Sequence, residues 1–372
     1  MQHQPHTTPA QGPTEISLHA PLSALSGPPA APIDGPLHQV TQFGPSRPVD
    51  EEIGSGIARL YKVIYGERYI SPLYSDPKRI CTEINEGRWH AFVGFDANGR
   101  VAGQVGMMLR PDSTFELGRD VVDPDARLRG SYKQLVRTRG EYVQKLIDSG
   151  DHTVDYQWAE SVTGHEGSQR TYKNTLGFVP CGIGALKYPD VFGRGQRESV
   201  VLMVKIVNPE IRCDRPLYVP GELNPLVGEI FNNLGCARTF EKTVVAPTGL
   251  DTLNFAVRDK RQVGQIGFDF CPEKTDAVHD VTMADDLVRT MRDEDDIHHF
   301  SARMSLQDPR TPALARLLAE NGFTFSHIEP RGSRDILELQ KIVGDEALDV
   351  KVIDEAMARM VAQIEATRRF VQ

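Results

Sequence analysis

The sequence predicts a mixed α/β fold (α+β in class), in which a mostly antiparallel sheet is flanked by helices. Two observations carry this prediction. First, residues 115–122 have the composition of a strand that ends at Pro124, which lacks an N–H, and a helix follows from near Gly130. Second, Asn98-Gly99 stands between two apolar runs, and this is the strongest short-range hairpin signal because both residues tolerate positive φ.

The elements around this hairpin follow in order. Apolar residues recur at helical spacing over residues 53–64, and residues 77–86 form a second short helix. The hairpin strands are residues 89–95 and 101–109, and with 115–122 they make an antiparallel meander. Beyond the helix that follows Gly130 and ends near Gly150, we expect strands over 154–161 and 198–206, with a glycine-bearing connection between Phe178 and the latter.

The loop after Pro124 predicts an anion site. A strand followed by a basic, glycine-containing loop and a helix N-terminus offers free backbone N–H groups and the positive end of the helix dipole to a phosphate. Arg127, Arg129 and Lys133 add positive charge at the same corner. We therefore expect a phosphorylated ligand here.

Residues 127–132 (RLRGSY) resemble the pyrophosphate loop of the GNAT acyltransferase superfamily, which reads Gln/Arg-x-x-Gly-x-Gly/Ala and cradles the diphosphate of coenzyme A. Arg127 and Gly130 match, whereas Tyr132 departs from the small residue that the family has there. The resemblance implies acetyl-CoA or another acyl-CoA as co-substrate. The implied cofactor-binding residues are Val121, Val122, Arg127, Leu128, Arg129, Gly130, Ser131, Tyr132, Lys133, His165 and Ser168.

A second segment, residues 164–178 (GHEGSQRTYKNTLGF), resembles the family's Asn-x-x-Ala-x-x-x-Tyr-x-x-x-x-Gly-Phe pattern. His165 stands where the family often has Asn, and Ser168 and Tyr172 follow it by three and seven residues. In the family this tyrosine points its hydroxyl at the coenzyme A sulfur. The two segments together cover residues 115–178 and imply a GNAT fold for residues 49–208.

The resemblance also suggests the catalytic residues. Glu116 lies on the strand before the loop, where some family members carry a catalytic glutamate, and could deprotonate the amine. The alternative is that Glu116 sits on an exposed face, paired with Arg119 or another base. Asp120 has the strand parity of Glu116 and could assist through water. Tyr172 is the expected proton donor to the thiolate, and a backbone N–H near Val121 or Val122 would stabilise the oxyanion.

The acceptor side is expected near the first helices. In a GNAT domain these helices and their connecting loop form one wall of the acceptor site, which makes Tyr65, Glu67, Arg68 and Tyr69 candidates for substrate binding. These side chains could line a polar pocket. They could equally be core tyrosines beside a solvated ion pair.

Residues 209–342 are predicted to form a second, degenerate GNAT-like domain. After a linker over 215–220 we expect helices over 225–234, 283–291 and 311–323 and strands over 253–257, 263–270, 299–306 and 335–342. Gly322-Phe323 repeats Gly177-Phe178, but Leu317 stands in the place of Tyr172 and no phosphate loop is present. This half should not bind coenzyme A. Residues 343–372 carry an amphipathic helix over 346–370, whose apolar stripe could pack on the second half or on another copy of the chain in a homodimer.

Composition narrows the function further. The first fifty residues hold ten prolines, which predicts a disordered tail over 1–48, either a docking arm or a plain leader. A net charge of −9 argues against nucleic acid as a partner. The scattered cysteines indicate a reducing cytoplasm without a zinc site, and residues 293–299 (DEDDIHH) are interpreted as a solvated acidic turn rather than a metal site. No apolar run is long enough to cross a membrane.

Two functions of different classes fit these observations. One is an acyl-CoA-dependent N-acyltransferase, in the first instance an N-acetyltransferase, acting on an amine of a small molecule or protein. The other is a catalytically weak module that binds coenzyme A or an effector. Glu116 and Tyr172 favour the first, whereas Tyr132 and His165 favour the second.

Overall fold

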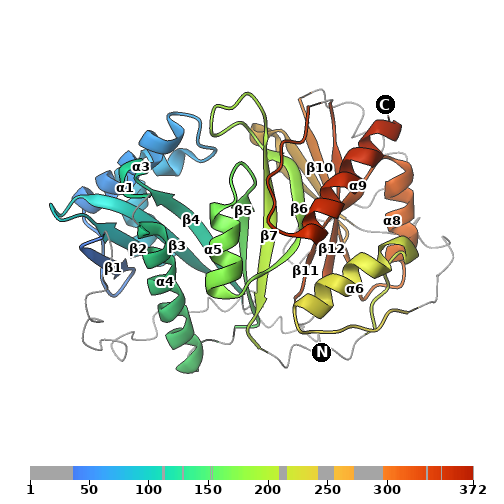
Figure 1. The fold of residues 1–372 in the computed structure, drawn as a ribbon, viewed down its shortest axis with the longest axis horizontal. Helices are drawn as coiled ribbons and strands as arrows, with labels where there is room; N and C mark the ends of the chain where they lie inside the picture. The colour runs from blue at the N-terminus through green and yellow to red at the C-terminus, as the bar shows by residue number, and fades with distance from the viewer. Residues whose placement is uncertain are drawn as a thin grey trace, which may run out of the picture.

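The computed structural model of the chain describes residues 37–110, 114–127, 130–150, 152, 154–208, 216–241, 255–271, 296–331, 334–344 and 346–371. These residues build one continuous 12-stranded sheet in the order β1-β2-β3-β4-β5-β7-β6-β11-β12-β10-β9-β8. Helices flank this sheet (Figure 1), so the predicted fold class is confirmed. None of the described helices has the length and hydropathy of a membrane span.

The first half of the chain contains the elements that the sequence predicts. It also contains two strands that the sequence does not predict, Gln39–Phe43 and Val179–Tyr188. The first helix begins where the Asp50 side chain accepts a hydrogen bond from the Ile53 N–H at 2.9 Å, and Asp76 caps the second helix in the same way. The elements are β1 (Gln39–Phe43), α1 (Glu51–Tyr65), α2 (Pro77–Asn85), β2 (His90–Phe95), β3 (Val101–Arg110), β4 (Thr114–Val122), α3 (Pro124–Arg127), α4 (Ser131–Asp148), β5 (Tyr156–Val162), α5 (Gly167–Leu176), β6 (Val179–Tyr188) and β7 (Glu198–Ile206).

The second half continues the same sheet. Its elements are α6 (Asn224–Asn233), β8 (Ala256–Lys260), β9 (Gln265–Asp269), β10 (His299–Ser305), α8 (Thr311–Glu320), β11 (Thr324–Glu329), β12 (Ile336–Ile342) and α9 (Glu355–Val371). The helix predicted over 283–291 lies outside the described residues.

The connectivity of the first half recurs in the second. Strand β5, helix α5 and strands β6 and β7 assemble in the spatial order β5-β7-β6, and β10, α8, β11 and β12 assemble in the order β10-β12-β11. In each half a hairpin precedes this unit, and its second strand runs parallel to the unit's first strand: β4 to β5, and β9 to β10. The chain therefore carries two units of similar topology.

The two units meet edge to edge at β6 and β11. These strands run antiparallel, with Gly182 opposite His327. A Cβ at Gly182 would lie 2.2 Å from the backbone oxygen of Ser326, so only glycine allows this approach. The last helix covers the seam, because α9 contacts both β6 and β11.

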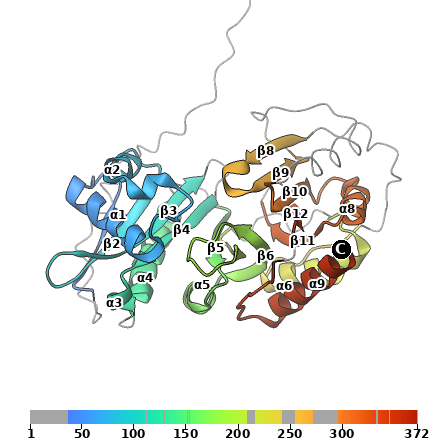
Figure 2. The ribbon, with the colours of Figure 1, turned by 90° about the horizontal axis from the view of Figure 1, so that it is seen from above.

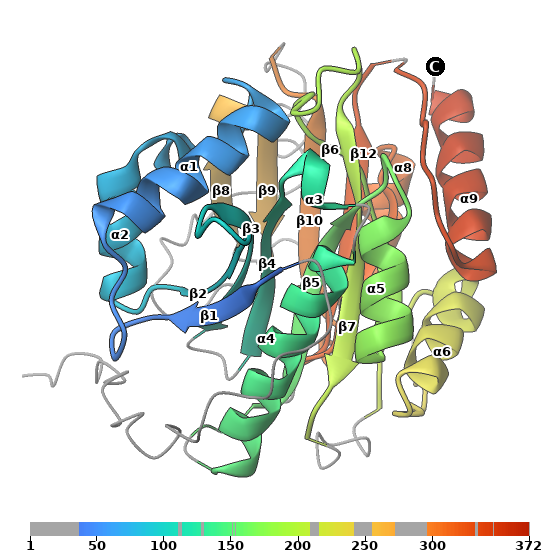
Figure 3. The same cartoon turned by 60° about the vertical axis from the view of Figure 1, so that its left-hand side comes forward.

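The sheet has two different faces. Helices α4, α5, α6 and α9 lie along one face, the lower side in Figure 2. On the other face, α1 packs on strands β3 and β4 of the first half, and the sheet curves from β4 round to β8 (Figure 2). Figure 3 shows β8 and β9 beyond β3 and β4, at the far edge of the same sheet.

Several predicted boundaries are wrong. The tail predicted over 1–48 does not extend that far, because β1 pairs with β2 and buries Phe43; residues 1–36 lie outside the described part. The strand predicted over 253–257 is shifted along the chain, because β8 runs from Ala256 to Lys260. The C-terminal helix begins at Glu355, where the Asp354 carboxylate accepts from the Ala356 N–H, and not at residue 346.

Candidate active site

Strands β4 and β5 separate along their length. They pair in parallel only where residues 114–116 face residues 156–158. Strand β4 continues to Val122, whereas the whole of β5 stays paired with β7. Beyond these three residue pairs no ladder joins the two adjacent parallel strands, and we call this unpaired stretch the opening.

A β-bulge accompanies this separation. On β3, Gln104 faces Val121 and Gly106 faces Gly118, so β4 has one residue more than β3 in between. Arg119 takes φ +56°, a left-handed conformation that is uncommon for a residue with a side chain. The extra residue reverses the alternation along the strand.

The bulge corrects the prediction that Asp120 assists Glu116. Glu116 lines a cleft on the open face of the sheet, whereas Asp120 bonds to side chains of α4 and α5 on the helical face. The parity argument is wrong because it assumed a regular strand. Asp120 is instead the acceptor of a buried network.

Four side chains form this network. Arg139 of α4, fully buried, donates to Asp120 Oδ1 at 2.7 Å and to the backbone oxygen of Gly106 at 2.9 Å. The Tyr172 hydroxyl donates to Asp120 Oδ2 at 3.1 Å and accepts from Arg139 Nη2 at 2.8 Å. The Tyr132 hydroxyl also donates to Asp120 Oδ2, at 3.0 Å.

Burial within this network determines the protonation state of the Tyr172 hydroxyl. Its side chain is only 2% exposed. Burial is the main cause that raises the pKa of Tyr172, and the positive charge of Arg139 opposes it. The hydroxyl therefore stays protonated around neutral pH and is a donor that already has an acceptor.

The N-terminus of α4 follows the end of β4 after the short helix α3. Gly130 caps it at φ +83° in the left-handed region with no side-chain cap, and among the described residues nothing lies within 4 Å of where a Cβ would stand. The Ser131 hydroxyl is turned back to the Ala126 oxygen at 3.0 Å, and Lys133 is exposed. Tyr132 points into the sheet and not over the helix end. Leu128 and Arg129, and the Arg127 side chain, lie outside the described part.

The other predicted cofactor residues lie nearby in the fold. Val121 and Val122 end β4 and are buried. His165 is exposed in the connection before α5, and Ser168 stands in its first turn. The buried Ser168 Oγ and Arg139 Nε have no hydrogen-bond partner, and these atoms belong to the two helices that follow β5 and β4.

A cleft of about 670 Å³ lies on the opposite, open face. Strands of both halves line it, from β4 and β5 to β9–β12. Glu116 projects into it, and its carboxylate is bonded by Arg110 Nε at 2.8 Å and lies 4.0 Å from Arg119. Glu116 and Tyr172 therefore stand on opposite faces of the sheet, one on each side of the opening.

The predicted acceptor residues separate into two groups. Tyr69 lines the cleft and packs edge-on against Tyr61, within a cluster that also includes Tyr65. Glu67 forms an exposed ion pair with Lys62 at 3.2 Å. Of the four residues, Tyr69 is the one that lines the cleft; Tyr65, Glu67 and Arg68 do not.

Other cleft residues were not singled out from the sequence. Glu160 accepts from Lys187 Nζ at 2.6 Å and from the Tyr188 hydroxyl at 2.5 Å. A glutamate at alternate spacing with Trp158 on a predicted strand was a usable signal for Glu160. Lys187 and Tyr188 could not be found in this way because β6 was not predicted.

One group in the described residues has the spacing of metal ligands. His327, Glu329 and Glu338 offer three atoms within 4.8 Å of one another. Arg303 stands among them, donating to Glu329 at 2.8 Å and lying 3.7 Å from Glu338. Arg303, together with Arg331 at 2.9 Å from Glu329, therefore already pairs with these carboxylates.

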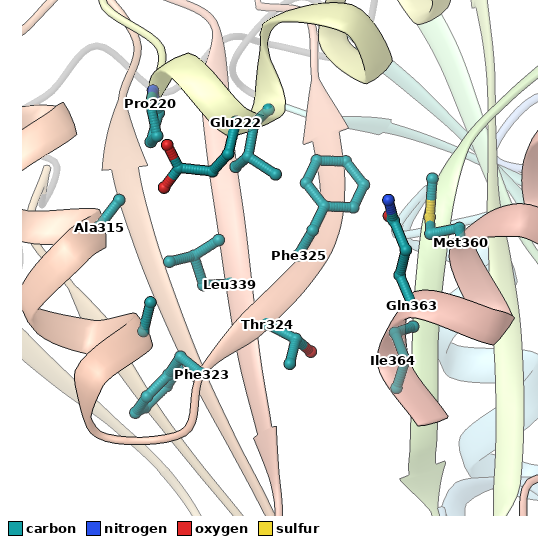
Figure 4. A pocket seen from close by; sticks show the side chains of 12 residues that line it. Pro220, Glu222, Ala315, Phe323, Thr324, Phe325, Leu339, Met360, Gln363 and Ile364 are labelled. Carbon is teal, nitrogen blue, oxygen red and sulfur yellow. The ribbon is translucent and has the colours of Figure 1, made fainter. Parts of the chain in front are cut away.

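A second cavity, of about 360 Å³, lies on the helix-covered face of the second half (Figure 4). Met360, Gln363 and Ile364 of α9 face Ala315 of α8 across it, and Phe325 and Leu339 come from the sheet. Its lining is mostly apolar and holds one carboxylate, Glu222. The titratable groups that a proton transfer needs are concentrated in the other cleft.

Comparisons with known proteins give likeness in structure alone. No family model matches the chain, and no curated protein matches it in sequence. Among solved structures, the spermidine N-acetyltransferase of Vibrio cholerae in complex with CoA and spermine is 16% identical, with a TM-score of 0.36, over 45% of this chain and 95% of that one.

Two further solved structures are similar to the same extent. An acetyltransferase of the GNAT family from Streptococcus pneumoniae is 17% identical, with a TM-score of 0.36, over 45% of this chain and 100% of that one. A Salmonella typhimurium structure with acetyl-CoA is 15% identical, with a TM-score of 0.36, over 46% of this chain and 96% of that one. These three solved structures are described as acetyltransferases, one of them of the GNAT family.

Proposed function

We propose that the chain is an acyl-CoA-dependent N-acyltransferase that transfers an acyl group, acetyl in the simplest case, to an amine. The observation that carries this proposal is the opening between β4 and β5. The N-terminus of α4, a candidate phosphate site, follows β4 on one face of the sheet, and the titratable cleft lies on the other face. A donor and an acceptor that approach from opposite faces would meet at the opening.

The residues present fit coenzyme A on the helical face. The first-turn N–H groups of α4 have no partner within the helix, and the open space over Gly130 leaves room for a diphosphate. The unpartnered atoms of Ser168 and Arg139 lie on the same face. When bound, an acyl-CoA supplies an activated acyl group with a thiolate as its leaving group.

The chain's own residues would manage the protons. Glu116 is the candidate base for the amine, because its carboxylate faces the cleft and Arg110 fixes its orientation. Tyr172 is the candidate acid, because the raised pKa keeps its hydroxyl protonated. Arg139 donates a hydrogen bond to that hydroxyl, and Asp120 accepts one from it, so the two residues fix its position.

A second candidate is a module that binds coenzyme A without efficient catalysis. The observation in its favour is that the Tyr172 hydroxyl is buried and bonded on both sides, so that donating its proton elsewhere requires breaking its bond to Asp120. Binding at the α4 N-terminus needs no such change.

The discriminating experiment is to incubate the protein with acetyl-CoA and a broad panel of primary amines and to measure the free thiol. The proposal expects release that depends on the amine and falls in Glu116→Gln, most strongly near neutral pH and with partial recovery at high pH, where the amine deprotonates unaided. Coenzyme A binding without thiol release across the panel would favour the second candidate.

A further inference from the structure

The cleft on the open face is richer in basic than in acidic side chains, although the chain as a whole has a net charge of −9. Strands β8 to β12 of the second half line one side of this cleft, and we call that side the second-half wall. The basic residues of the lining are Arg110, Arg119, Lys187, Arg258, Lys260, Arg303 and Arg331, and the acidic ones are Glu116, Glu160, Glu198, Glu329 and Glu338.

Apart from Lys260, each cationic side chain of the second-half wall belongs to an ion pair. Arg303 binds Asp269 at 3.2 Å and Glu329 at 2.8 Å. Arg258 also pairs with Asp269, and Arg331 lies 2.9 Å from Glu329. These guanidinium groups have their counter-charges within the wall itself.

Lys260 is different. It ends β8, is exposed and lines the cleft, and no carboxylate of the described residues comes within 4.0 Å of its ammonium group. Its surroundings add positive charge: the pKa of Lys260 is lowered by desolvation first and then by Lys187, with Arg258 acting in the same direction against Glu160 and Glu338. An unpaired cation beside further cations attracts an anion.

We propose that Lys260 binds an anionic group of the acceptor, a carboxylate or a phosphate, so that the preferred acceptor carries an amine and an anion in one molecule. This inference rests on the proposed function and specifies its substrate class. The amine would lie toward Glu116 on the first-half wall. The anion would lie toward Lys260 on the second-half wall, which gives the second half a role in selecting the acceptor.

The same arrangement disfavours a polyamine. A second ammonium group placed at the second-half wall would meet the charge of Lys260, and repulsion between like charges is costly where water is partly excluded. A neutral alkylamine would make neither contact. The order of preference is therefore amine with anion, then neutral amine, then diamine.

The test compares Lys260→Gln with wild type on four probes: 5-aminopentanoate, 2-aminoethyl phosphate, pentylamine and pentane-1,5-diamine. The matched control is Arg261→Gln, which removes the same charge one residue further on, where Arg261 pairs with Asp259 outside the cleft. Thiol release gives KM and kcat, and calorimetry on the CoA-saturated protein gives affinity. The two anionic probes show whether carboxylate or phosphate is preferred.

We expect KM for the preferred anionic probe to rise about 10- to 100-fold in Lys260→Gln, the loss of one charge-assisted contact. We also expect kcat within about twofold and no change for pentylamine. An equal effect in Arg261→Gln, or a wild-type preference for the diamine, overturns the inference while leaving the transferase intact. If no probe releases thiol, calorimetry decides: anionic probes that bind wild type and not Lys260→Gln support the anion site, and equal binding overturns it.

Discussion

The two parallel strand pairs of this molecule differ in how far they stay together. Strands β4 and β5 pair over residues 114–116 and then diverge, whereas all five residues of β9 pair with β10, from Gln265 to Asp269 against His299 to Arg303. The first pair therefore leaves the opening, whereas the second is paired along the whole of β9.

The carboxylates at the ends of β4 and β9 show how this difference is maintained. Asp120 finds its guanidinium on a helix, because Arg139 of α4 reaches down into the opening. Asp269 finds its guanidinium on the neighbouring strand, because Arg303 belongs to β10. The helix-borne partner accompanies the incomplete ladder, and the partner on the adjacent strand accompanies the continuous one. Under the proposed function, two units of similar connectivity would serve as a reaction centre and as a wall.

The largest effect is expected at the N-terminus of α4, where we propose that the phosphates of coenzyme A bind. Gly130→Val places a β-branched residue at φ +83° and closes the backbone approach, so coenzyme A binding should become undetectable by calorimetry while circular dichroism stays native-like. Gly150→Val is the control, because Gly150 has φ +72° at the other end of α4 and equally open space. Comparable loss of binding in both variants would attribute the effect to strain in α4.

The next largest effect is expected when the Tyr172 hydroxyl is removed. If Tyr172 gives its proton to the thiolate, Tyr172→Phe should lower kcat by about 10²-fold or more, with little change in coenzyme A affinity. Tyr132→Phe loses a similar hydrogen bond to the same Asp120 oxygen and should leave kcat within about threefold. Equal losses in the two variants would mean that the network matters and the proton donor does not.

The network itself should be visible in stability. Asp120→Asn leaves the Arg139 guanidinium buried without its counter-charge, and breaking such a pair costs about 3–5 kcal/mol of the free energy of unfolding. Replacing both partners, in Asp120→Asn with Arg139→Met, should recover part of this loss. Chemical denaturation measures both variants, and a single variant as stable as wild type would remove the network as the support of the opening.

A smaller effect compares one buried histidine from each half. Burial lowers the pKa of His299 to about 3, and that of His90 to about 4, so both are neutral in the folded chain. The unfolded chain takes up a proton near the ordinary value of 6.5, so the stabilisation is complete above that pH and is lost as the pH falls toward the folded pKa. In His299→Gln, the denaturation midpoint should therefore fall less steeply than in wild type as the pH is lowered from 6.5 to 4. An unchanged slope would contradict a neutral His299.

Local patterns in the sequence predict much of this molecule. The hairpin at Asn98-Gly99, the strand ending before Pro124 and the closing strand over 198–206 depend on residues close in sequence, and the structure has them. Strand β6 was missed because Pro180, Gly182 and Gly184 have the composition of a connection. Gly182 is there because β11, far away in sequence, needs the space.

The site follows the same division. Residues of the phosphate loop and Tyr172 are recognisable because they lie within short motifs, although the structure does not test their roles. The bulge that turns Asp120 to the helical face depends on the φ angle of Arg119, which no pattern of residue types reveals. Glu160, Lys260 and Glu338 line one cleft only because of the order of the strands in the sheet. No local signal in the sequence could have predicted that they lie in the same cleft.

The most direct test of this account is the number of coenzyme A molecules that one chain binds. Both units offer similar connectivity, but only β4 and β5 open beside a helix N-terminus of the described residues. Calorimetric titration of the full chain should give one site per chain, and Gly130→Val should give none. Two equivalent sites, or one site that survives Gly130→Val at wild-type affinity, would contradict the assignment of the open strand pair as the binding site.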